Sequence, residues 1–124
     1  MDNNTELKSL DDFLIGKSDQ TIELFNYFVM RFQEIGNITL IPAKSMIGIA
    51  TPYRRIAWVT QLGKNFIHVV FPFERPFEDN MCFLKIAKVP GDDKQYNHHF
   101  RMLYKADINE EIIKFMRLAY DFRK

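Results

Sequence analysis

The sequence has only one cysteine, Cys82, among its 124 residues, and five glycines and five prolines. A single cysteine cannot form a disulfide within the chain, which is typical of a reducing compartment. The polar, acidic start MDNNTELKSLDDF is unlike a signal peptide, and every apolar run is shorter than the ~20 residues that span a bilayer. We therefore expect a soluble cytoplasmic protein without a membrane partner.

Acidic residues are absent from residues 38–73. The formal charges there are all positive: Lys44, Arg54, Arg55 and Lys64. Residues 37–73 thus carry +4, whereas residues 1–36 carry −4 and residues 74–124 carry +1. A local positive field is compatible with the near-neutral total. The alternative is that these four bases only keep a solvated sheet surface soluble.

Catalytic motifs are absent as well. The chain has no glycine-rich phosphate loop, no serine elbow and no metal-binding helix motif. Its paired acids, Asp11-Asp12 and Asp92-Asp93, fit a helix start and a turn. Cys82 lies in an apolar run, which favours a small buried hydrophobe over a nucleophile. The sequence predicts no catalytic residue and no cofactor, which disfavours an enzyme.

Histidine is scarce, and the three residues are His68, His98 and His99. A metal site needs several converging ligands. His98 and His99 are adjacent on a predicted strand and point to opposite faces, so at most one of them can join His68. We expect no metal site, and we interpret His68 as a half-exposed sheet residue.

Two long amphipathic helices are predicted, over residues 19–35 and about 108–122, because apolar side chains recur there at helical spacing. Ser18 or Asp19 caps the first helix, and a capping box from Asp107 to Glu110 opens the second. A single turn capped by Ser9 precedes them. Its inward side chains are Leu10, Phe13 and Leu14.

Strands are predicted wherever β-branched and aromatic residues lie between turn residues. Alternation within the strand predicted at residues 55–61 assigns Ile56 and Trp58 to the core, and Ala57 and Val59 to the outer face with Arg55. A bulge of one residue would invert this assignment. The predicted strands cover residues 46–51, 55–61, 66–72, 81–89 and 97–105, and residues 38–41 are a candidate for an additional strand before them.

Alternation within the two later strands gives similar assignments. Ile67, Val69 and Phe71 are expected in the core, with His68 on the outer face. The last strand is expected to turn four side chains inward and Arg101 outward. The inward residues are His98, Phe100, Met102 and Tyr104.

The order of these elements predicts an α+β fold. We expect one domain over residues 1–124, in which residues 1–8 form a loose tail. The fold is an antiparallel β-meander of about five strands, with the N-terminal and C-terminal helices packed on one face.

Several motifs resemble those of one known family. They are LDDF at residues 10–13, RIAWV at 55–59, FIHVV at 66–70 and the His98-His99 pair before the last helix. In these features the chain, from about Leu10 to Tyr120, is similar to the domain-of-unknown-function family 5655. The resemblance implies a stand-alone bacterial protein or an attached module, sometimes labelled a predicted transport protein, and it implies no active site.

The remaining candidate for function is a basic sheet face, whose basic side chains could hold phosphates while an aromatic ring stacks on a nucleobase. We predict a non-enzymatic binding module with nucleic acid as its partner, or else an acidic protein surface. Two alternatives are an apolar ligand pocket between helices and sheet and a homodimer formed through the outer sheet surface. The candidate ligand-binding residues are Lys44, Tyr53, Arg54, Arg55, Lys64, His68 and Arg101.

Overall fold

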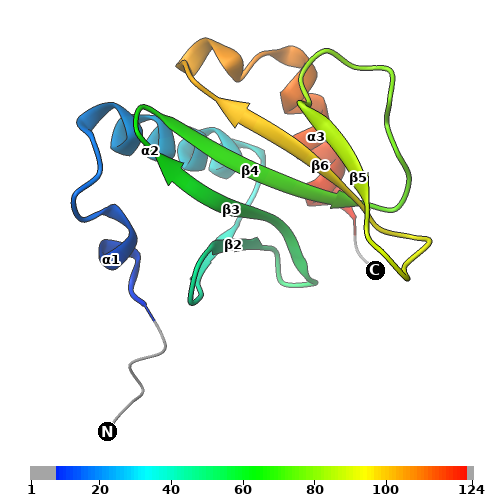
Figure 1. Ribbon diagram of the computed structural model, residues 1–124, viewed down its shortest axis with the longest axis horizontal. Helices are drawn as coiled ribbons and strands as arrows, with labels where there is room; N and C mark the ends of the chain where they lie inside the picture. Colours follow the sequence, from blue (N-terminus) through cyan, green and yellow to red (C-terminus); the bar gives the residue numbers. More distant parts are fainter. Residues whose placement is uncertain (1–7, 123–124) are drawn as a thin grey trace, which may run out of the picture.

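The computed structural model describes residues 8–122, so residues 1–7 of the predicted tail lie outside the described residues. Six strands form one antiparallel sheet, and two long helices lie on one side of it (Figure 1). This confirms the predicted α+β class, with six strands where about five were expected. The strands are β1 (Thr39–Pro42), β2 (Ile47–Ala50), β3 (Arg55–Gly63), β4 (Phe66–Phe73), β5 (Lys85–Lys88) and β6 (Tyr96–Met102). The helices are α1 (Leu10–Leu14), α2 (Asp19–Ile35), the 3-10 turn η2 (Lys105–Asp107) and α3 (Glu110–Asp121).

The strand order is β1-β2-β3-β4-β6-β5, so only the first four strands form a meander in chain order. Strand β6 lies between β4 and β5 (Figure 1). The strand predicted over residues 81–89 is the shorter β5, because residues 81–84 belong to the connector that follows β4. Phe77 and Phe83 of that connector pack against the core. This order makes β4 and β6 direct neighbours.

Helix α2 forms as its sequence predicts. The side chain of Ser18 caps it by accepting a hydrogen bond from the backbone N–H of Thr21. Leu24, Phe25, Phe28 and Phe32 recur at helical spacing and are fully buried against the sheet. An aromatic side chain buries roughly 150–250 Å², so a few phenylalanines account for much of the core.

Thr21 also fixes the turn between β3 and β4. Its hydroxyl donates to the carbonyl of Gly63 and accepts from the N–H of Asn65. Asn65 has a φ of 66°, in the left-handed region that Asn tolerates, and its side chain accepts from the Ser18 hydroxyl at 2.7 Å. The start of α2 therefore holds one end of the sheet.

The N-cap of helix α3 lies two residues after its predicted position. Asn109, not Asp107, is the N-cap, and its side chain accepts from the N–H of Ile112. The Asp107 carboxylate instead accepts from the N–H groups of Leu103 and Tyr104. Because β6 ends before this turn, Tyr104 is 65% exposed, which corrects its predicted inward position. The buried stripe of α3 is Ile112, Phe115, Met116 and Ala119.

The inner face of the sheet, which packs on the helices, matches the predicted alternation in β4 and β6. In β3 the prediction was wrong, because register shifts occur between Ile49 and Ala50 and between Val59 and Gln61. Ile56 is buried as expected, but Ala57 and Val59 are buried too, and Trp58 and Thr60 are half-exposed. The bulges moved the tryptophan out of the core.

Candidate anion-binding face

The outer face of the sheet is the one turned away from α2 and α3. Its members follow from the register, since a residue shares a face with the residue it pairs with on the next strand. Lys85 pairs with His99, and Arg101 pairs with His68. The outer-face residues used below are Arg55, Trp58, Phe66, His68, Val70, Lys85, His99 and Arg101.

This face receives no negative charge from the sheet, because none of the six strands contains Asp or Glu. Three permanent cations lie on it: Arg55, Lys85 and Arg101. Within residues 8–122 none of the three forms an ion pair; the ion pairs there join Arg31 to Glu34 and Lys88 to Asp93. Among the described residues, no carboxylate therefore pairs with the cations of the outer face.

Two aromatic rings of the outer face are placed in the same way. A Cβ at Gly48 would lie 3.1 Å from the Trp58 ring, so this ring covers the glycine of the neighbouring strand. The Phe66 ring likewise covers Gly63. A guanidinium lies over each ring, that of Arg55 at 5.2 Å from the Trp58 centroid and that of Arg101 at 4.8 Å from the Phe66 centroid. Each unit thus presents a planar cation supported by an aromatic ring.

His68 and His99 meet on this face, where Nε2 of His68 lies 2.9 Å from Nδ1 of His99. One ring donates a hydrogen bond and the other accepts it. Nδ1 of His68 is buried and has no hydrogen-bond partner in the described part of the chain. Whichever ring donates, one polar atom of His68 stays unsatisfied, which costs about 1–3 kcal/mol.

The surroundings of this pair lower the pKa of both histidines below the usual value of 6.5. Burial is the largest cause for each ring. The charges of Arg101 and Lys85 further lower the pKa of His68, and His68 and Lys85 further lower that of His99. Both shifts favour the neutral rings, and the permanent charge of this region comes from Lys85 and Arg101.

A depression of about 520 Å³ lies over the histidine pair. It spans β3, β4 and β6 and reaches the edge strand β5. Its lining combines the basic side chains of Lys85 and Arg101 with the apolar side chains of Val70 and Leu84, of which Leu84 is 59% exposed. The lining residues are Thr60, Gln61, His68, Val70, Leu84, Lys85, His99 and Arg101.

The structure divides the seven predicted site residues among three places. Arg55, His68 and Arg101 share the outer face, and the last two are register partners. Lys44 and Lys64 lie in the β1–β2 and β3–β4 turns, at one end of the sheet. Tyr53 and Arg54 lie in the β2–β3 turn at the opposite end, where the Arg54 guanidinium lies 4.5 Å from the Phe122 ring centroid.

Sequence reasoning missed Lys85 and His99 as members of this site. Alternation places His99 on the outer face opposite His98. The sequence does not show that the strand of His99 lies next to β4, where His68 is. Lys85 could have been assigned only from the register of β5 on β6, which follows an irregular connector. Trp58 was missed because the bulges in β3 interrupt the alternation that assigns it to the core, and Phe66, on the same face as His68, was not among the candidate binding residues.

His98, on the inner face, is fully buried and has a structural role. Its Nδ1 lies 2.8 Å from the carbonyl of Tyr96, and its Nε2 accepts from the N–H of Phe77 at 3.0 Å. A carbonyl can only accept, so Nδ1 carries the proton and the ring is neutral. Burial lowers its pKa. His98 thereby ties the connector after β4 to β6.

Cys82 lies in the same connector and is half-buried. Burial, followed by the neighbouring charge of Glu111, raises the pKa of its thiol to about 12. A thiol with that pKa is almost entirely protonated at neutral pH, whereas nucleophilic cysteines have lowered pKa values. The described surroundings of Cys82 therefore suit a packing role.

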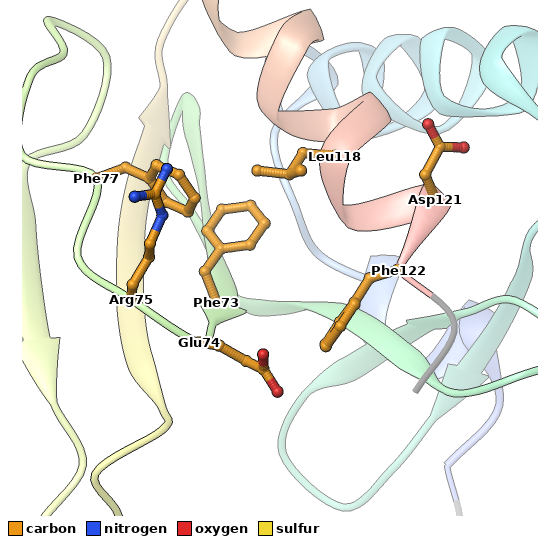
Figure 2. Close-up of a pocket in the computed structure, with 7 residues that line it drawn as sticks. All are labelled: Phe73, Glu74, Arg75, Phe77, Leu118, Asp121 and Phe122. Atoms are coloured by element: carbon orange, nitrogen blue, oxygen red, sulfur yellow. The ribbon is translucent and has the colours of Figure 1, made fainter.

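A second cavity, of about 300 Å³, opens between the end of β4 and the end of α3 (Figure 2). Phe73, Phe77, Leu118 and Phe122 supply its apolar walls. The Arg75 guanidinium lies over the Phe77 ring, 4.5 Å from its centroid (Figure 2). Glu74 and Asp121 complete the lining, so the charged residues around this cavity have both signs.

Neither a metal cluster nor a membrane span occurs in the part of the chain that the structure describes. No three His, Cys, Asp or Glu side chains converge there, and no helix there has the length and apolar character to cross a membrane. Comparisons with protein families, with curated proteins and with solved structures find no match. The resemblance to domain-of-unknown-function family 5655 therefore stays a prediction.

Proposed function

We propose that this protein binds single-stranded nucleic acid on the outer face of its sheet. The observation that carries the proposal is the set of three cations on that face, Arg55, Lys85 and Arg101, none of which forms an ion pair within residues 8–122. A phosphodiester backbone supplies the negative charge that these side chains lack.

The pairing of each arginine with an aromatic ring favours single-stranded over double-stranded nucleic acid as the ligand. Bases stack on aromatic rings and on arginine guanidinium planes, but only when they are unpaired. The Arg55–Trp58 and Arg101–Phe66 units offer two such surfaces on one face. A base stacked on a unit of this kind contributes about 1–3 kcal/mol.

Trp58 gives a direct assay because it is the only tryptophan in the chain. Its fluorescence is expected to be quenched when a mixed-sequence single-stranded oligonucleotide is added. If three cations each contact one phosphate, the logarithm of the affinity should fall against the logarithm of salt with a slope of about −2. Absence of any fluorescence or anisotropy change at the lowest salt would disprove the proposal.

Two variants separate this face from general basicity. Arg55→Gln should weaken binding and reduce the salt slope, whereas Arg117→Gln, an exposed arginine of α3, should change neither. Polyglutamate controls for charge alone: equal affinity for this polymer would indicate an acidic protein partner instead. The mass in solution is measured first, since a homodimer through the outer face would hide the site.

The apolar cavity of Figure 2 favours a second candidate function, the binding of a small apolar ligand. Its volume of about 300 Å³ is at the lower limit of ligand pockets. A ligand that binds only the folded state raises the apparent stability, so thermal shifts across a set of apolar metabolites test it. Leu118→Glu should abolish any shift, and Arg117→Gln should leave it unchanged. A set without any hit would count against this function.

A further inference from the structure

Four side chains converge on the depression of the outer face from three neighbouring strands. Lys85 of β5 is the register partner of His99, and Arg101 of β6 is the register partner of His68 on β4. All four line the same depression of about 520 Å³. The register therefore combines two permanent cations with the hydrogen-bonded histidine pair on one small area.

These groups are suited to an anion and unsuited to a metal cation. The strands around them contain no carboxylate, and Lys85 and Arg101 would repel a cation. Lysine, arginine and an imidazole N–H all donate hydrogen bonds. The other described side chains that line the depression are Thr60, Gln61, Val70 and Leu84, which carry no charge.

The second observation that favours a ligand site concerns the hydrogen bonding of His68. Its Nδ1 is buried and has no hydrogen-bond partner among residues 8–122. Protein folding alone gives no reason to bury a histidine pair in this incomplete arrangement, because unsatisfied buried polar groups reduce stability. Such exceptions are typical of sites that complete their interactions with a ligand.

We propose that Lys85, Arg101, His68 and His99 form a binding site for a phosphate monoester, and that its binding is coupled to uptake of a proton by the histidine pair. This inference rests on the proposed function and specifies which part of the nucleic acid binds here, namely the phosphate at the end of the nucleic-acid strand. A phosphate monoester carries a charge of about −1.5 to −2 at neutral pH, which Lys85 and Arg101 together balance, whereas an internal phosphodiester carries only one negative charge.

Proton uptake follows from the charges that face the pair. In the unliganded protein the groups facing His68 and His99 from β5 and β6 are Lys85 and Arg101, and both disfavour an imidazolium. The residues that face the pair from β3 are Thr60 and Gln61, which do not titrate in this range. A bound dianion reverses the local field and favours the charged ring.

The test uses the whole protein and observes the imidazole nitrogen resonances by NMR. Adenosine 5′-monophosphate is expected to shift the resonances of His68 and His99 toward the imidazolium values, and adenosine is expected to leave them unchanged. Sulfate, which stays dianionic between pH 5 and pH 8, isolates the proton coupling. Its affinity should rise as the pH falls through this range, at constant ionic strength set with chloride.

Variants assign the effect to the four residues. Arg101→Gln should weaken binding of the monophosphate about tenfold or more, because it removes a charge-assisted hydrogen bond. Lys88→Gln is the matched control for Lys85→Gln, since Lys88 is on the same strand but pairs with the exposed Asp93 outside the depression. The double variant His68→Gln, His99→Gln keeps hydrogen-bonding side chains that cannot titrate, so it should flatten the pH dependence for sulfate.

An oligonucleotide with hydroxyl groups at both ends separates this inference from the proposed function. If it binds while the monophosphate does not, the nucleic-acid function stands and the phosphate site is wrong. If the monophosphate binds and the oligonucleotide does not, the phosphate site stands as a site for a small free metabolite. Equal affinity of the monophosphate for the parent protein and for Arg101→Gln would overturn the site.

Discussion

On the inner face of the sheet, His98 is fully buried and both of its ring nitrogens are hydrogen-bonded. On the outer face, the half-buried His68–His99 pair leaves Nδ1 of His68 without a hydrogen-bond partner in the described chain. The same residue type thus completes its interactions on one face and not on the other. Because a fold gains nothing from an unsatisfied buried group, the comparison separates residues that maintain the fold from residues available for binding.

The cations show the same contrast between regions. Away from the outer face, Lys88 is paired with Asp93 and Arg31 with Glu34. On the outer face, Lys85 and Arg101 have no carboxylate partner among residues 8–122. Ion pairs at a protein surface contribute little to stability, so the absence of acids matters for the local potential and for recognition rather than for folding.

The largest expected difference between the faces concerns stability. Phe71→Ala on the inner face removes a fully buried ring and should lower the free energy of unfolding by about 3–5 kcal/mol. Phe66→Ala on the outer face removes a half-buried ring and should cost clearly less. Urea denaturation followed by Trp58 fluorescence measures both, and Phe71→Leu serves if the alanine variant does not fold. Equal losses would contradict the assignment of the two faces.

The histidines give the next largest difference. His98→Leu leaves the N–H of Phe77 and the carbonyl of Tyr96 without their partner and should cost about 2 kcal/mol. His68→Leu removes a ring that is already incompletely bonded, so its cost should stay under about 1 kcal/mol. The same urea denaturation experiment measures the free energy of unfolding of both variants. A greater loss of this free energy for His68→Leu than for His98→Leu would mean that the outer pair maintains the fold.

Much of the fold was predictable because its information is local. The buried stripes of α2 and α3 repeat with the period of a helix, and the inward residues of β4, such as Ile67 and Val69, alternate without interruption. In β3 the two bulges depend on the partner strands, and a single sequence does not encode them visibly. For that reason Trp58 was assigned to the core and Val59 to the surface, the reverse of what is observed.

The candidate site was predictable only in part for a related reason. The acid-free stretch predicted Arg55 and His68, and the expected strand pairing added Arg101; the structure places these three on one face. The same prediction also included turn residues such as Lys44 and Tyr53. Which bases converge is decided by the position of β6 between β4 and β5. The connector before β5 packs on the core through Phe77 and Phe83, a long-range contact that no local pattern reveals.

Acid is expected to weaken the fold through all three histidines. Each has a folded-state pKa lowered below the usual 6.5, with burial as the first cause. The unfolded chain therefore binds more protons below pH 6.5, so stability is complete above that pH and falls as the pH drops from it toward the lowered folded-state values. Urea midpoints measured between pH 5 and pH 8 test this direction. In the double variant His68→Gln, His99→Gln the fall should be smaller, with the remainder due to His98, and an unchanged profile would contradict burial of the outer pair.

The smallest expected effect probes how firmly the outer aromatic rings are held. In Gly48→Ala the new Cβ would lie 3.1 Å from the Trp58 ring, so the ring must shift by a few tenths of an ångström, whereas the Arg55 side chain at 3.4 Å is in ordinary contact. Because Trp58 is half-exposed and can move outward, the free energy of unfolding should change by no more than about 0.5 kcal/mol, while the emission maximum of this single tryptophan moves. Gly36→Ala is the comparison near the helices, since its Cβ would overlap the ring of Tyr120, and it should destabilise more. If Gly48→Ala costs as much, the Trp58 ring is held as rigidly as a core residue and cannot reorient to accept a base.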